Sequence, residues 1–503
     1  MTDAAGSPAI CTDTRADSST DISADTSTDT DMRTPTATPS PEPTAIPTAG
    51  LGRFHLLAWR WHFYAGLYVV PFLAMLVLTG LVMVFFTGFQ NRLGMNIPVL
   101  PQAQTATVTA QAQAVLARRP GAQLKDYVAP KSATLPAWFS VQVDGRVEAV
   151  AVNPYTAEVI RSVDKENTVF AWAEKIHGSL LIGDLGDRLI EIAAGLGMVL
   201  LVTGVYMAWP RGPNGWRRVL LPDLRARGRA GWASLHVGVA FWMGLVLGFF
   251  LLTGLAWTGI WGGQFVQPWG SFPASKWDEV PTSDVTHAAL STPGLKEVPW
   301  GLELTPLPAS GSAAGQPGIA AGQPVNLETV NAYARRIGFA GQYRVAVPQD
   351  ATGVYTISAD SMGGDLTDPT GDRYVHIDRH TGRVLAQVSF ADYSPMAKFM
   401  AVGIALHQGD LGRWSAWLNV VFCLAVLFLC VSGITMWWQR RPARAGRLVA
   451  PRAPANAARW KTGALVMLAV GLAFPLSGAV LVAAWLVDAL MLPRLPALRR
   501  WLN

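Results

Sequence analysis

Five stretches of the chain are apolar and nearly free of charge over twenty or more residues, and they constrain the fold more than any other feature. A helix needs about 20 residues to cross ~30 Å of hydrocarbon, so each stretch is long enough to span a membrane. The stretches are residues 62–86, 190–209, 236–261, 414–438 and 462–487. The sequence therefore predicts an integral membrane protein, with an α-helical bundle of five spans.

The first and third stretches share their layout. His62 precedes Thr79 by seventeen residues, and His236 precedes Thr253 by the same number. The residues that follow these threonines are Gly80 and Gly254. Each glycine lies eighteen positions after its histidine, which is five helical turns, so histidine and glycine share one helix face at opposite ends of a span.

The second and fourth stretches share another pattern. The sequence GDLG precedes both, at 183–186 and 409–412, and His177 and His407 lie just before it. Both stretches then contain a hydroxyl residue followed by a glycine, Gly204 or Gly433, and end in tryptophan and arginine. The two copies are offset by 226 residues at GDLG and by 229 thereafter. We therefore predict a tandem duplication of span, outer segment and span (2+2), plus one further span.

The charge distribution predicts the orientation. Residues 1–50 carry eight acids and two arginines, so the remainder of a chain of net charge +6 carries about +12. Arginines crowd the links at 211–229 and 440–461, which the positive-inside rule places in the cytoplasm. The outer segments then lie on the opposite side, the amino terminus is cytoplasmic and the carboxyl terminus is outside. Residues 1–50 are polar and predict a disordered cytoplasmic tail.

The two outer segments each predict a small α+β module. In the first, VTAQAQAVLARRPGAQL predicts a helix, and WFSVQVDGRVEAVAVNPYTAEVI predicts strands joined by tight turns. In the second, a helix at VNLETVNAYARRIGF precedes strands at YTISAD and RYVHIDRHTGRVLAQV. Residues 262–325 predict a loop with little regular structure.

These patterns give the following predicted boundaries. They are 1–50 for the tail, 51–89 for the first span, 90–175 for the first outer module, 176–210 for the second span, 211–234 for a basic link, 235–262 for the third span, 263–400 for the outer loop and second module, 401–439 for the fourth span, 440–461 for a second basic link, and 462–503 for the fifth span and tail.

The predicted topology sorts four histidines into two levels, with His62 and His236 near the cytoplasmic side and His177 and His407 near the outer side. Parallel repeats in a membrane are related by an axis along its normal, which pairs His62 with His236 and His177 with His407. Two imidazoles without a carboxylate or thiolate suit the axial positions of a haem iron. Zinc would want four ligands, and copper a thiolate or a methionine set. We therefore expect these histidines to hold two b-type haems.

Four glycines fall at the level of the opposite histidine pair: Gly80, Gly204, Gly254 and Gly433. A missing side chain there would let a flat macrocycle approach the helix. The alternative is that small residues only allow the helices to pack closely.

The other histidines are weaker candidates. His55 lies seven residues before His62 and could share its face. His376 and His380 are four apart, but the predicted strand and turn do not bring them together on a helical face. His287 stands alone in the outer loop, and no metal site beyond the haem iron is predicted.

Six sequence segments resemble the PepSY-associated transmembrane family of iron-regulated bacterial inner-membrane proteins, and the two outer modules resemble PepSY domains. The segments are RWHFYAGL, EKIHGSLLIGDLG, LVTGVYMAWPR, LHVGVAFW, ALHQGDLGRW and SGITMWWQRR. The resemblance covers about residues 54–490. PepSY-like segments end in a VDPxTGxV-type hairpin, which the second module keeps as HIDRHTGRVL. The first module reads VNPYTAEVI, with Ala157 at the position of the turn glycine.

Members of this family include haem-containing ferric-siderophore reductases. The resemblance implies an inner-membrane enzyme with periplasmic modules that reduces a ferric siderophore with electrons from the cytoplasm and so releases iron. No nucleotide-binding motif is present, so the donor is a separate molecule, either a reductase, a quinol or a reduced flavin. The alternative is a PepSY-type regulatory membrane protein that binds peptides or a protease. A transporter is disfavoured because no acidic residue lies deep in a span.

Aromatic residues dominate the outer loop near the predicted outer haem. They are Trp261, Phe265, Trp269, Phe272, Trp277 and Trp300. Aromatics at a membrane face commonly form an interfacial belt. If some of them line a pocket instead, they would suit a bulky, largely uncharged iron chelate.

Overall fold

The computed structural model describes residues 53–441, 448, 450, 451, 461–487, 490 and 494. The predicted disordered tail at 1–50 lies outside the described residues, as do most of the second basic link and of the terminal segment whose outward course was predicted.

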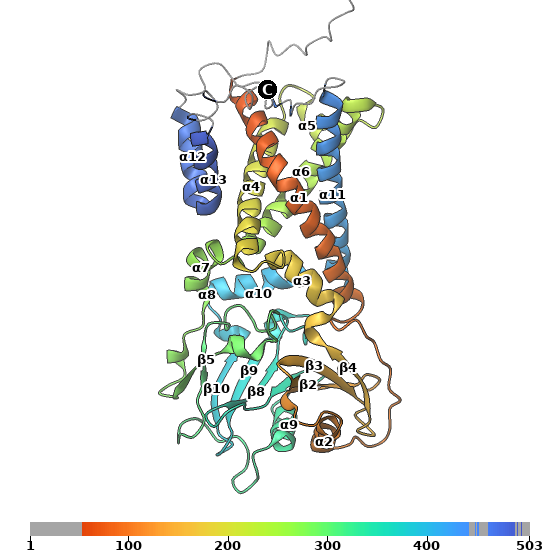
Figure 1. The fold of residues 1–503 in the computed structure, drawn as a ribbon, viewed down its shortest axis with the longest axis vertical. Helices are drawn as coiled ribbons and strands as arrows, with labels where there is room; N and C mark the ends of the chain where they lie inside the picture. Colours follow the sequence, from red (N-terminus) through yellow and green to blue (C-terminus); the bar gives the residue numbers. More distant parts are fainter. Residues whose placement is uncertain are drawn as a thin grey trace, which may run out of the picture. The chain divides into compact units, whose positions relative to one another are not determined.

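Within these described residues, four helices are long and apolar enough to cross a membrane: α1 (Arg53–Phe89), α4 (Asp184–Ala208), α6 (Gly228–Leu255) and α11 (Arg413–Arg440). α1 packs against α4 and α11, and α6 packs against the same two helices, so α1 and α6 face each other diagonally (Figure 1). The short helix α5 (Gly215–Leu220) and the end of α11 lie at the end of the bundle away from the sheet. Both carry arginines of the predicted cytoplasmic links.

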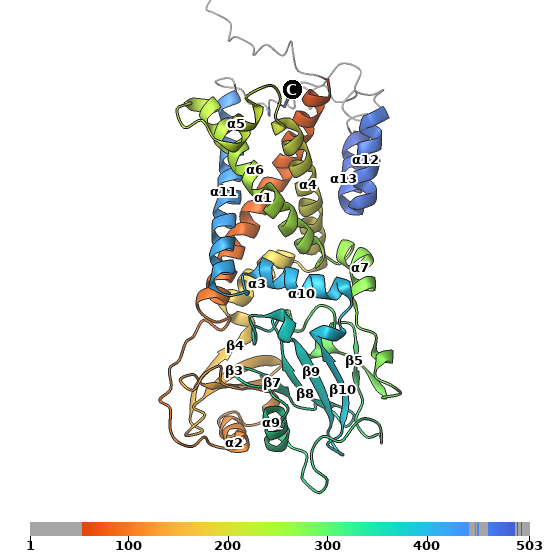
Figure 2. The same ribbon diagram turned by 180° about the vertical axis from the view of Figure 1, so that it is seen from behind.

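Two further helices carry the predicted starts of the second and fourth spans. α3 (Val169–Ser179) ends before α4, and α10 (Pro395–Gln408) ends before α11, so the long helices begin at Asp184 and Arg413, after the predicted boundaries at 176 and 401. The GDLG sequences contribute to the turns after them, where Gly409 has a φ of 80°. A Cβ on Gly186 would lie 1.8 Å from the carbonyl oxygen of Ser179, so only glycine permits this return. α3 and α10 lie between the long helices and the sheet (Figure 2).

The predicted fifth span is instead a helical hairpin. α12 (Lys461–Ala473) and α13 (Pro475–Leu486) pack against each other. Proline lacks the N–H of a continuing helix and keeps the preceding residue out of the α region, so the helix breaks at Phe474. Each helix is about 20 Å long or less, shorter than a bilayer core of ~30 Å. The described residues therefore contain no fifth membrane-spanning helix, and the five-span prediction is not confirmed.

The outer segments form one antiparallel sheet of eight strands, in the order β10-β9-β8-β7-β1-β2-β3-β4. Its first half contains β1 (Gln123–Val128), β2 (Ala137–Val143), β3 (Arg146–Val152) and β4 (Val159–Asp164), and its second half contains β7 (Arg344–Ala346), β8 (Val354–Ala359), β9 (Arg373–Asp378) and β10 (Val384–Ser389). Each predicted module therefore forms one half of a continuous sheet. In the turn before β4, Ala157 stands where a glycine was expected, and it still adopts the left-handed conformation with a φ of 57°.

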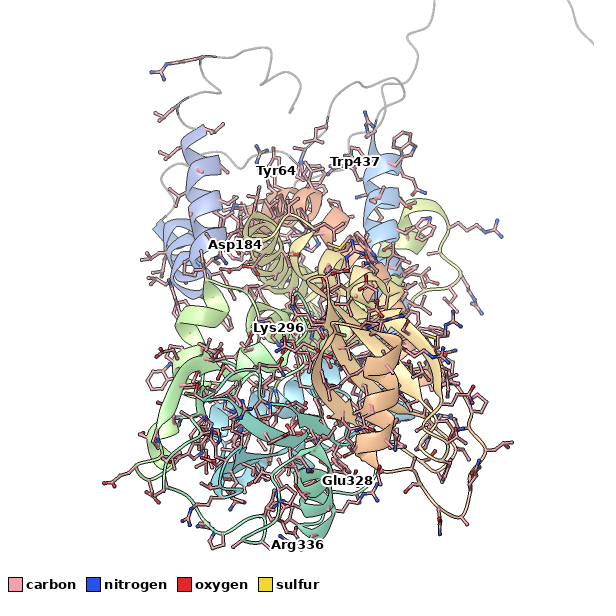
Figure 3. All side chains as sticks on the ribbon, turned by 60° about the horizontal axis from the view of Figure 1, so that its bottom comes forward. Tyr64, Asp184, Lys296, Glu328, Arg336 and Trp437 are labelled. Atoms are coloured by element: carbon pink, nitrogen blue, oxygen red, sulfur yellow. The ribbon has the colours of Figure 1, made fainter. Side chains whose placement is uncertain are left out.

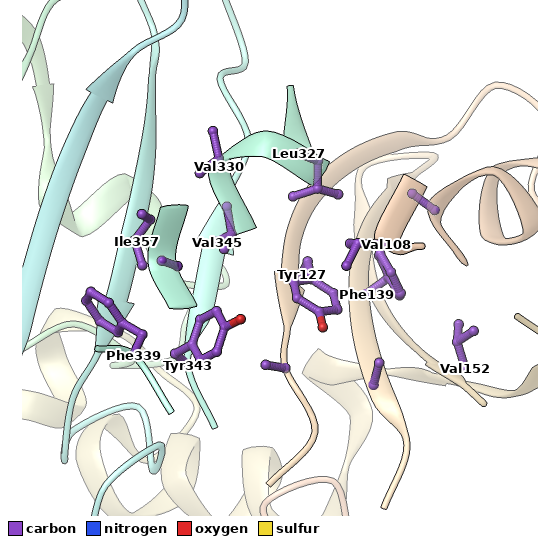
Figure 4. Packing of buried hydrophobic residues seen from close by; sticks show 14 of the residues in the cluster. Val108, Tyr127, Phe139, Val152, Leu327, Val330, Phe339, Tyr343, Val345 and Ile357 are labelled. Atoms are coloured by element: carbon purple, nitrogen blue, oxygen red, sulfur yellow. The ribbon is translucent and has the colours of Figure 1, made fainter. Parts of the chain in front are cut away.

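The two halves join through β1 and β7, where Tyr127 lies opposite Val345. Neither strand was predicted from the sequence, and Gln123 and Leu124 of β1 were expected to be helical. Tyr127, Phe139, Val345 and Ile357 are almost fully buried in one hydrophobic core that crosses the junction (Figure 4). Burial of each such side chain contributes about 1.5–3 kcal/mol, so the junction is a stable part of the domain.

Helices α2 (Val108–Arg118) and α9 (Leu327–Arg336) add Val115 and Val330 to the same core. α9 begins with a capping box between Asn326 and Thr329. Glu328 on α9 (Figure 3) accepts a hydrogen bond from the backbone N of Thr109 at the start of α2 (3.0 Å). The two helices therefore brace the junction from one side.

The predicted irregular loop at 262–325 contains short regular elements. They are α7 (Trp261–Phe265), α8 (Gln267–Gly270), β5 (Thr282–Thr286) and β6 (Pro306–Pro308), with 3₁₀ turns η2 (Ala274–Lys276) and η3 (His287–Leu290). Three more 3₁₀ turns, η1 (Lys165–Asn167), η4 (Pro369–Gly371) and η5 (Phe390–Asp392), flank the sheet. β5 and β6 pair in a separate two-stranded sheet, which the sequence did not predict.

Candidate functional site

The bundle contains four contacts of one kind, each between a histidine and a hydroxyl from another helix. At the end away from the sheet, His62 on α1 lies with its Nδ1 3.0 Å from Thr203 Oγ1 on α4. His236 on α6 lies with its Nδ1 2.7 Å from Ser432 Oγ on α11. The two contacts occupy equivalent positions in the two repeats, as the tandem duplication predicts.

The other two contacts lie at the sheet end of the bundle. His177, near the end of α3, has its Nδ1 2.9 Å from Thr79 Oγ1 on α1. His407, near the end of α10, has its Nδ1 2.7 Å from Thr253 Oγ1 on α6. The predicted two levels of histidine are therefore present, although His177 and His407 come from short helices that precede the spans.

The hydrogen bonds of the hydroxyls determine the tautomer of each histidine. Thr203 Oγ1 lies 2.6 Å from the carbonyl oxygen of Val199 in its own helix, and the hydroxyl has only one hydrogen to donate. The hydroxyl therefore accepts a hydrogen bond from Nδ1–H of His62. Equivalent bonds run from Thr79 to Met75 (2.8 Å), from Thr253 to Phe249 (2.8 Å) and from Ser432 to Leu429 (3.1 Å). All four imidazoles then carry their lone pair on Nε2.

The glycine after each hydroxyl residue lies against the imidazole that the hydroxyl binds. The distances from an added Cβ to the nearest ring carbon, Cε1, are 3.3 Å between Gly204 and His62, 3.9 Å between Gly433 and His236, 3.7 Å between Gly80 and His177, and 3.9 Å between Gly254 and His407. Each predicted glycine therefore lies against a histidine at the other end of the bundle from the histidine that precedes it in the chain. Each hydroxyl and glycine together form a cradle for one ring, which was not foreseen from the sequence.

His62 and His236 lie near each other at one level of the bundle, and His177 and His407 lie near each other at the other level. The ring of Phe250 lies 4.6 Å from that of His407 and stacks on Phe422 at 4.1 Å, so the outer pair has an aromatic wall.

These residues fit the axial ligation of a haem. Metal-bound histidine commonly donates its second ring N–H to a neighbouring group, which fixes its orientation and increases its basicity. Here Nδ1 is the donor, and Nε2 of His62, His177, His236 and His407 makes no hydrogen bond within the described part of the chain. Over the same residues, no group of three or more His, Cys, Asp or Glu side chains could hold a metal ion. Each level thus offers two imidazoles whose Nε2 carries a lone pair.

The family model described as the PepSY-associated TM region matches residues 59–440. The chain belongs to this family. The match covers more than half of the sequence, including most of α1, the other three long helices, the outer sheet and all four histidines. No curated protein matches the chain.

In this PepSY-associated transmembrane protein, the four hydroxyl residues that contact the histidines were not predicted from the sequence. Thr79 and Thr253 marked the repeat, but their contacts are with His177 and His407 rather than with the histidines of their own helices. The signal was present, because a threonine or serine precedes each of the four glycines.

The remaining histidines do not form a second site of this kind. His55 lies beside Tyr206, with ring centroids 6.3 Å apart. His376 contacts His287, not His380, which lies in the turn before β10 and contacts the Ala351 carbonyl. The predicted separation of His376 from His380 is thus confirmed, whereas the pairing with His287 was not visible in the sequence.

His287 and His376 form a buried neutral pair, with their Nε2 atoms 3.1 Å apart. Burial lowers the pKa of His287 to about 4, so the ring is neutral at ordinary pH. His287 Nδ1 donates to the Thr305 carbonyl (2.7 Å), and His376 Nδ1 accepts from Thr356 Oγ1 (3.0 Å). His376 Nε2–H then donates to His287 Nε2. Every ring nitrogen of this pair has a partner.

The outer domain also contains a cleft of about 630 Å³ beside edge strand β10. Its lining residues are Phe272, Lys276, Trp277, Arg373, Gln387, Val388, Ser389 and Asp392. Of the six predicted aromatics, Phe272 and Trp277 line this cleft, Trp300 is buried against α10, and Trp269 is exposed. Trp261 donates a hydrogen bond to the Ala473 carbonyl in the hairpin. Some of the predicted aromatics therefore line a pocket, and others lie on the surface.

Proposed function

We propose that this chain carries electrons across a bacterial inner membrane through two b-type haems and reduces a ferric siderophore on the periplasmic side. The observation that carries the proposal is the set of four histidines whose Nδ1 atoms donate to hydroxyls, leaving Nε2 free at two levels of one bundle. A bis-histidine haem supplies a one-electron iron couple when bound.

The chain's own residues would position this couple. Thr203 and Ser432 hold the rings of His62 and His236, and Thr79 and Thr253 hold those of His177 and His407 in the same way. Because each hydroxyl belongs to a different helix from its histidine, the packing of the bundle determines the direction of each Nε2. The two levels lie at opposite ends of the bundle, as a path across the membrane requires.

The direction of transfer follows from charge. The arginines Arg217, Arg218 and Arg225 are exposed at the end of the bundle away from the sheet, which the positive-inside rule assigns to the cytoplasm. Moving a negative charge outward from a negative interior gains roughly 2.3 kcal/mol per 100 mV. A separate cytoplasmic or quinol donor therefore delivers electrons at the His62 level, and the His177 level is the outlet.

The cleft beside β10 suits the chelate. Its volume of about 630 Å³ lies in the range of small-molecule sites, roughly 300–1,000 Å³. Phe272 and Trp277 give it an apolar wall, while Lys276, Gln387 and Asp392 supply polar contacts of both signs. A bulky chelate of low net charge matches this lining better than a bare metal ion does.

The test is the absorption of the purified protein from haem-replete cells. We expect a red protein with a reduced-minus-oxidised spectrum of bis-histidine b-type haem and about two haems per chain. After reduction with dithionite and removal of the excess, separate additions of ferric hydroxamate, catecholate and citrate would identify the preferred chelate by fast reoxidation. A colourless, iron-free protein contradicts the proposal. Equal reoxidation by all three, no faster than by air, contradicts siderophore reduction.

A further inference from the structure

Three aspartates are buried together where the outer domain meets α10. Asp360, Asp365 and Asp372 are 2%, 5% and 1% exposed. Asp360 and Asp365 lie in the loop after β8, which is tightened by bonds from the backbone N–H groups of Asp365 and Leu366 to the Asp360 carbonyl (3.0 and 3.1 Å). Asp372 immediately precedes β9. Removal of carboxylates from water is costly unless they are paired, hydrogen-bonded or protonated.

The hydrogen bonds to these carboxyls come from neutral donors. The backbone N of Gly363 and the hydroxyl of Tyr374 donate to Asp360 (2.5 and 2.8 Å), and the backbone N and hydroxyl of Ser361 donate to Asp372 (2.8 and 3.4 Å). Asp365 Oδ1 accepts from Gln342 (3.0 Å), but its Oδ2 has no partner among the described residues. Neutral donors alone therefore do not support three full negative charges.

Positive charge near the cluster is also limited. The charged and titratable groups that face it are Arg344 from β7, Tyr374 from β9, Tyr393 before α10, Glu297 from the loop before Pro299, and Arg92 after α1. Arg344 also pairs with Asp126 (3.3 Å) and Glu297 (3.8 Å), so its charge is shared. Burial and mutual repulsion raise the pKa of Asp360 to about 7 and that of Asp372 to about 8. The cluster therefore holds protons near neutral pH.

A small cavity separates the cluster from α10. Its volume of about 10 Å³ is close to what one water molecule needs. Asp372 and Tyr393 line one part of it, and Ala397, Ala401 and Ile404 of α10 line another. Tyr393 is 4% exposed, and its hydroxyl has no partner in the described part of the chain. A carboxyl and an unpaired hydroxyl thus border a water-sized space against the helix that carries His407.

The same loop contacts residues that follow His407. Ile404 is one helical turn before His407 on α10. Gln408 Nε2 lies 3.9 Å from Met362 Sδ in the loop between Asp360 and Asp365. Through Met362 and Gln408 the loop that carries the cluster contacts the end of the helix that carries His407.

We propose that the cluster of Asp360, Asp365 and Asp372 binds one proton from the outer solution each time an electron reaches the His177 and His407 level. The inference rests on the proposed function. One electron arrives from the cytoplasmic side, and one proton forms an O–H bond on a carboxylate, with no other bond changed. When the electron leaves to the ferric chelate, the proton is released on the same side, where the freed chelator oxygens bind it.

The physical reason is reciprocal coupling between two sites. An added electron makes the outer level more negative by one charge, which disfavours an ionised carboxylate nearby. By linkage, a proton on the carboxylate makes arrival of the electron more favourable by the same free energy. The midpoint potential of the outer couple must then fall as pH rises.

The first test is a redox titration of the haem-loaded protein between pH 6 and 9. In the wild type, we expect the potential of the outer couple to decrease with pH, and in Asp372→Asn and Asp360→Asn to become nearly independent of pH. Asp144→Asn, at an exposed turn between β2 and β3, is the matched control and should keep the wild-type slope. A pH-independent wild-type potential, or an unchanged slope in both cluster variants, overturns the inference.

A second measurement needs no variant. The reduced-minus-oxidised infrared spectrum of the wild type should show a protonated carboxyl band that grows on reduction and shifts in heavy water. Its absence overturns the inference even if the asparagine variants fail to fold. A protein without haem overturns the proposed function as well, whereas a haem-loaded protein with a pH-independent outer potential overturns only the proton coupling.

Discussion

His62 donates a hydrogen bond from Nδ1 to Thr203 Oγ1 across the interface of α1 and α4, over 3.0 Å. The relationship recurs at His236 and Ser432 in the second repeat. In both, the hydroxyl gives its own hydrogen to a carbonyl of its own helix, so the imidazole must be the donor. A local helical bond on one helix thus determines which imidazole nitrogen of a neighbouring helix keeps its lone pair.

Thr203→Val removes this acceptor and nearly keeps the shape of the side chain. We expect it to lower the affinity for the haem at the His62 level by about 10- to 100-fold, because second partners of metal-bound histidine contribute that much. The measurement is haem occupancy during titration of haem into the depleted protein. Thr435→Val is the matched control, because Thr435 on α11 also bonds a carbonyl four residues back (2.8 Å) but is only half-buried. Equal losses in both variants would show that the histidine contact is irrelevant.

Single histidine variants test the pairing across the bundle. His62→Ala and His236→Ala should each remove the same haem and leave the other spectrally intact, because the two repeats place these side chains at one level, on α1 and α6. His177→Ala and His407→Ala should each remove the other haem. Redox-resolved absorption and low-temperature electron paramagnetic resonance distinguish the two. If His62→Ala and His177→Ala abolished the same haem, ligation would run within each half of the chain instead.

The buried aspartates predict a dependence of stability on pH. The pKa of Asp372 is raised to about 8 by burial and by Asp360, whereas an unfolded chain has a value near ~3.9. The folded state keeps its proton where the unfolded state has lost it. The resulting stabilisation is complete below about pH 4 and is lost as pH rises through about 8.

Asp372→Asn should therefore flatten the fall of the thermal midpoint between pH 5 and 9. At pH 9 the variant should melt higher than the wild type, because the amide carries no charge to bury. Each 1 kcal/mol corresponds to roughly 2–4 °C in a large domain. Asp144→Asn is again the control. A wild-type slope that persists in Asp372→Asn would assign the pH dependence to other groups.

The sequence predicted those features that depend on period and spacing. Histidine positions, the glycines on the same face and the tandem repeat all follow from residues on one helix or at one offset. Contacts between segments that are far apart in the chain could not be predicted from these patterns. The pairing of His287 with His376 joins residues 89 apart, and the bond from His177 to Thr79 joins residues 98 apart, with no local pattern to announce either.

Two differences from the predicted fold have a similar origin. Hydropathy alone made 462–487 one span, and Pro475 did not announce a break by itself, because α1 continues through Pro71. The outer modules were predicted separately because pairing between β1 and β7 is not encoded in either strand alone. Short edge strands pair when another edge is available, and here the duplicated module supplies it.

The cleft beside β10 gives the last prediction. Gln387 is exposed on β10 and lines the cleft, so Gln387→Trp should fill part of its volume of about 630 Å³ without disturbing the buried face of the strand. We expect reoxidation of the reduced haems by a ferric siderophore to slow by about tenfold or more, mainly through a higher KM, while the haem spectra stay unchanged. Arg161→Trp is the control, because it adds an exposed indole to the opposite edge strand, β4. Binding of a redox-inert gallium chelate, measured by calorimetry, should weaken in Gln387→Trp alone. Unchanged chelate binding and reoxidation in that variant would move the substrate site away from β10, while leaving the two-haem path intact.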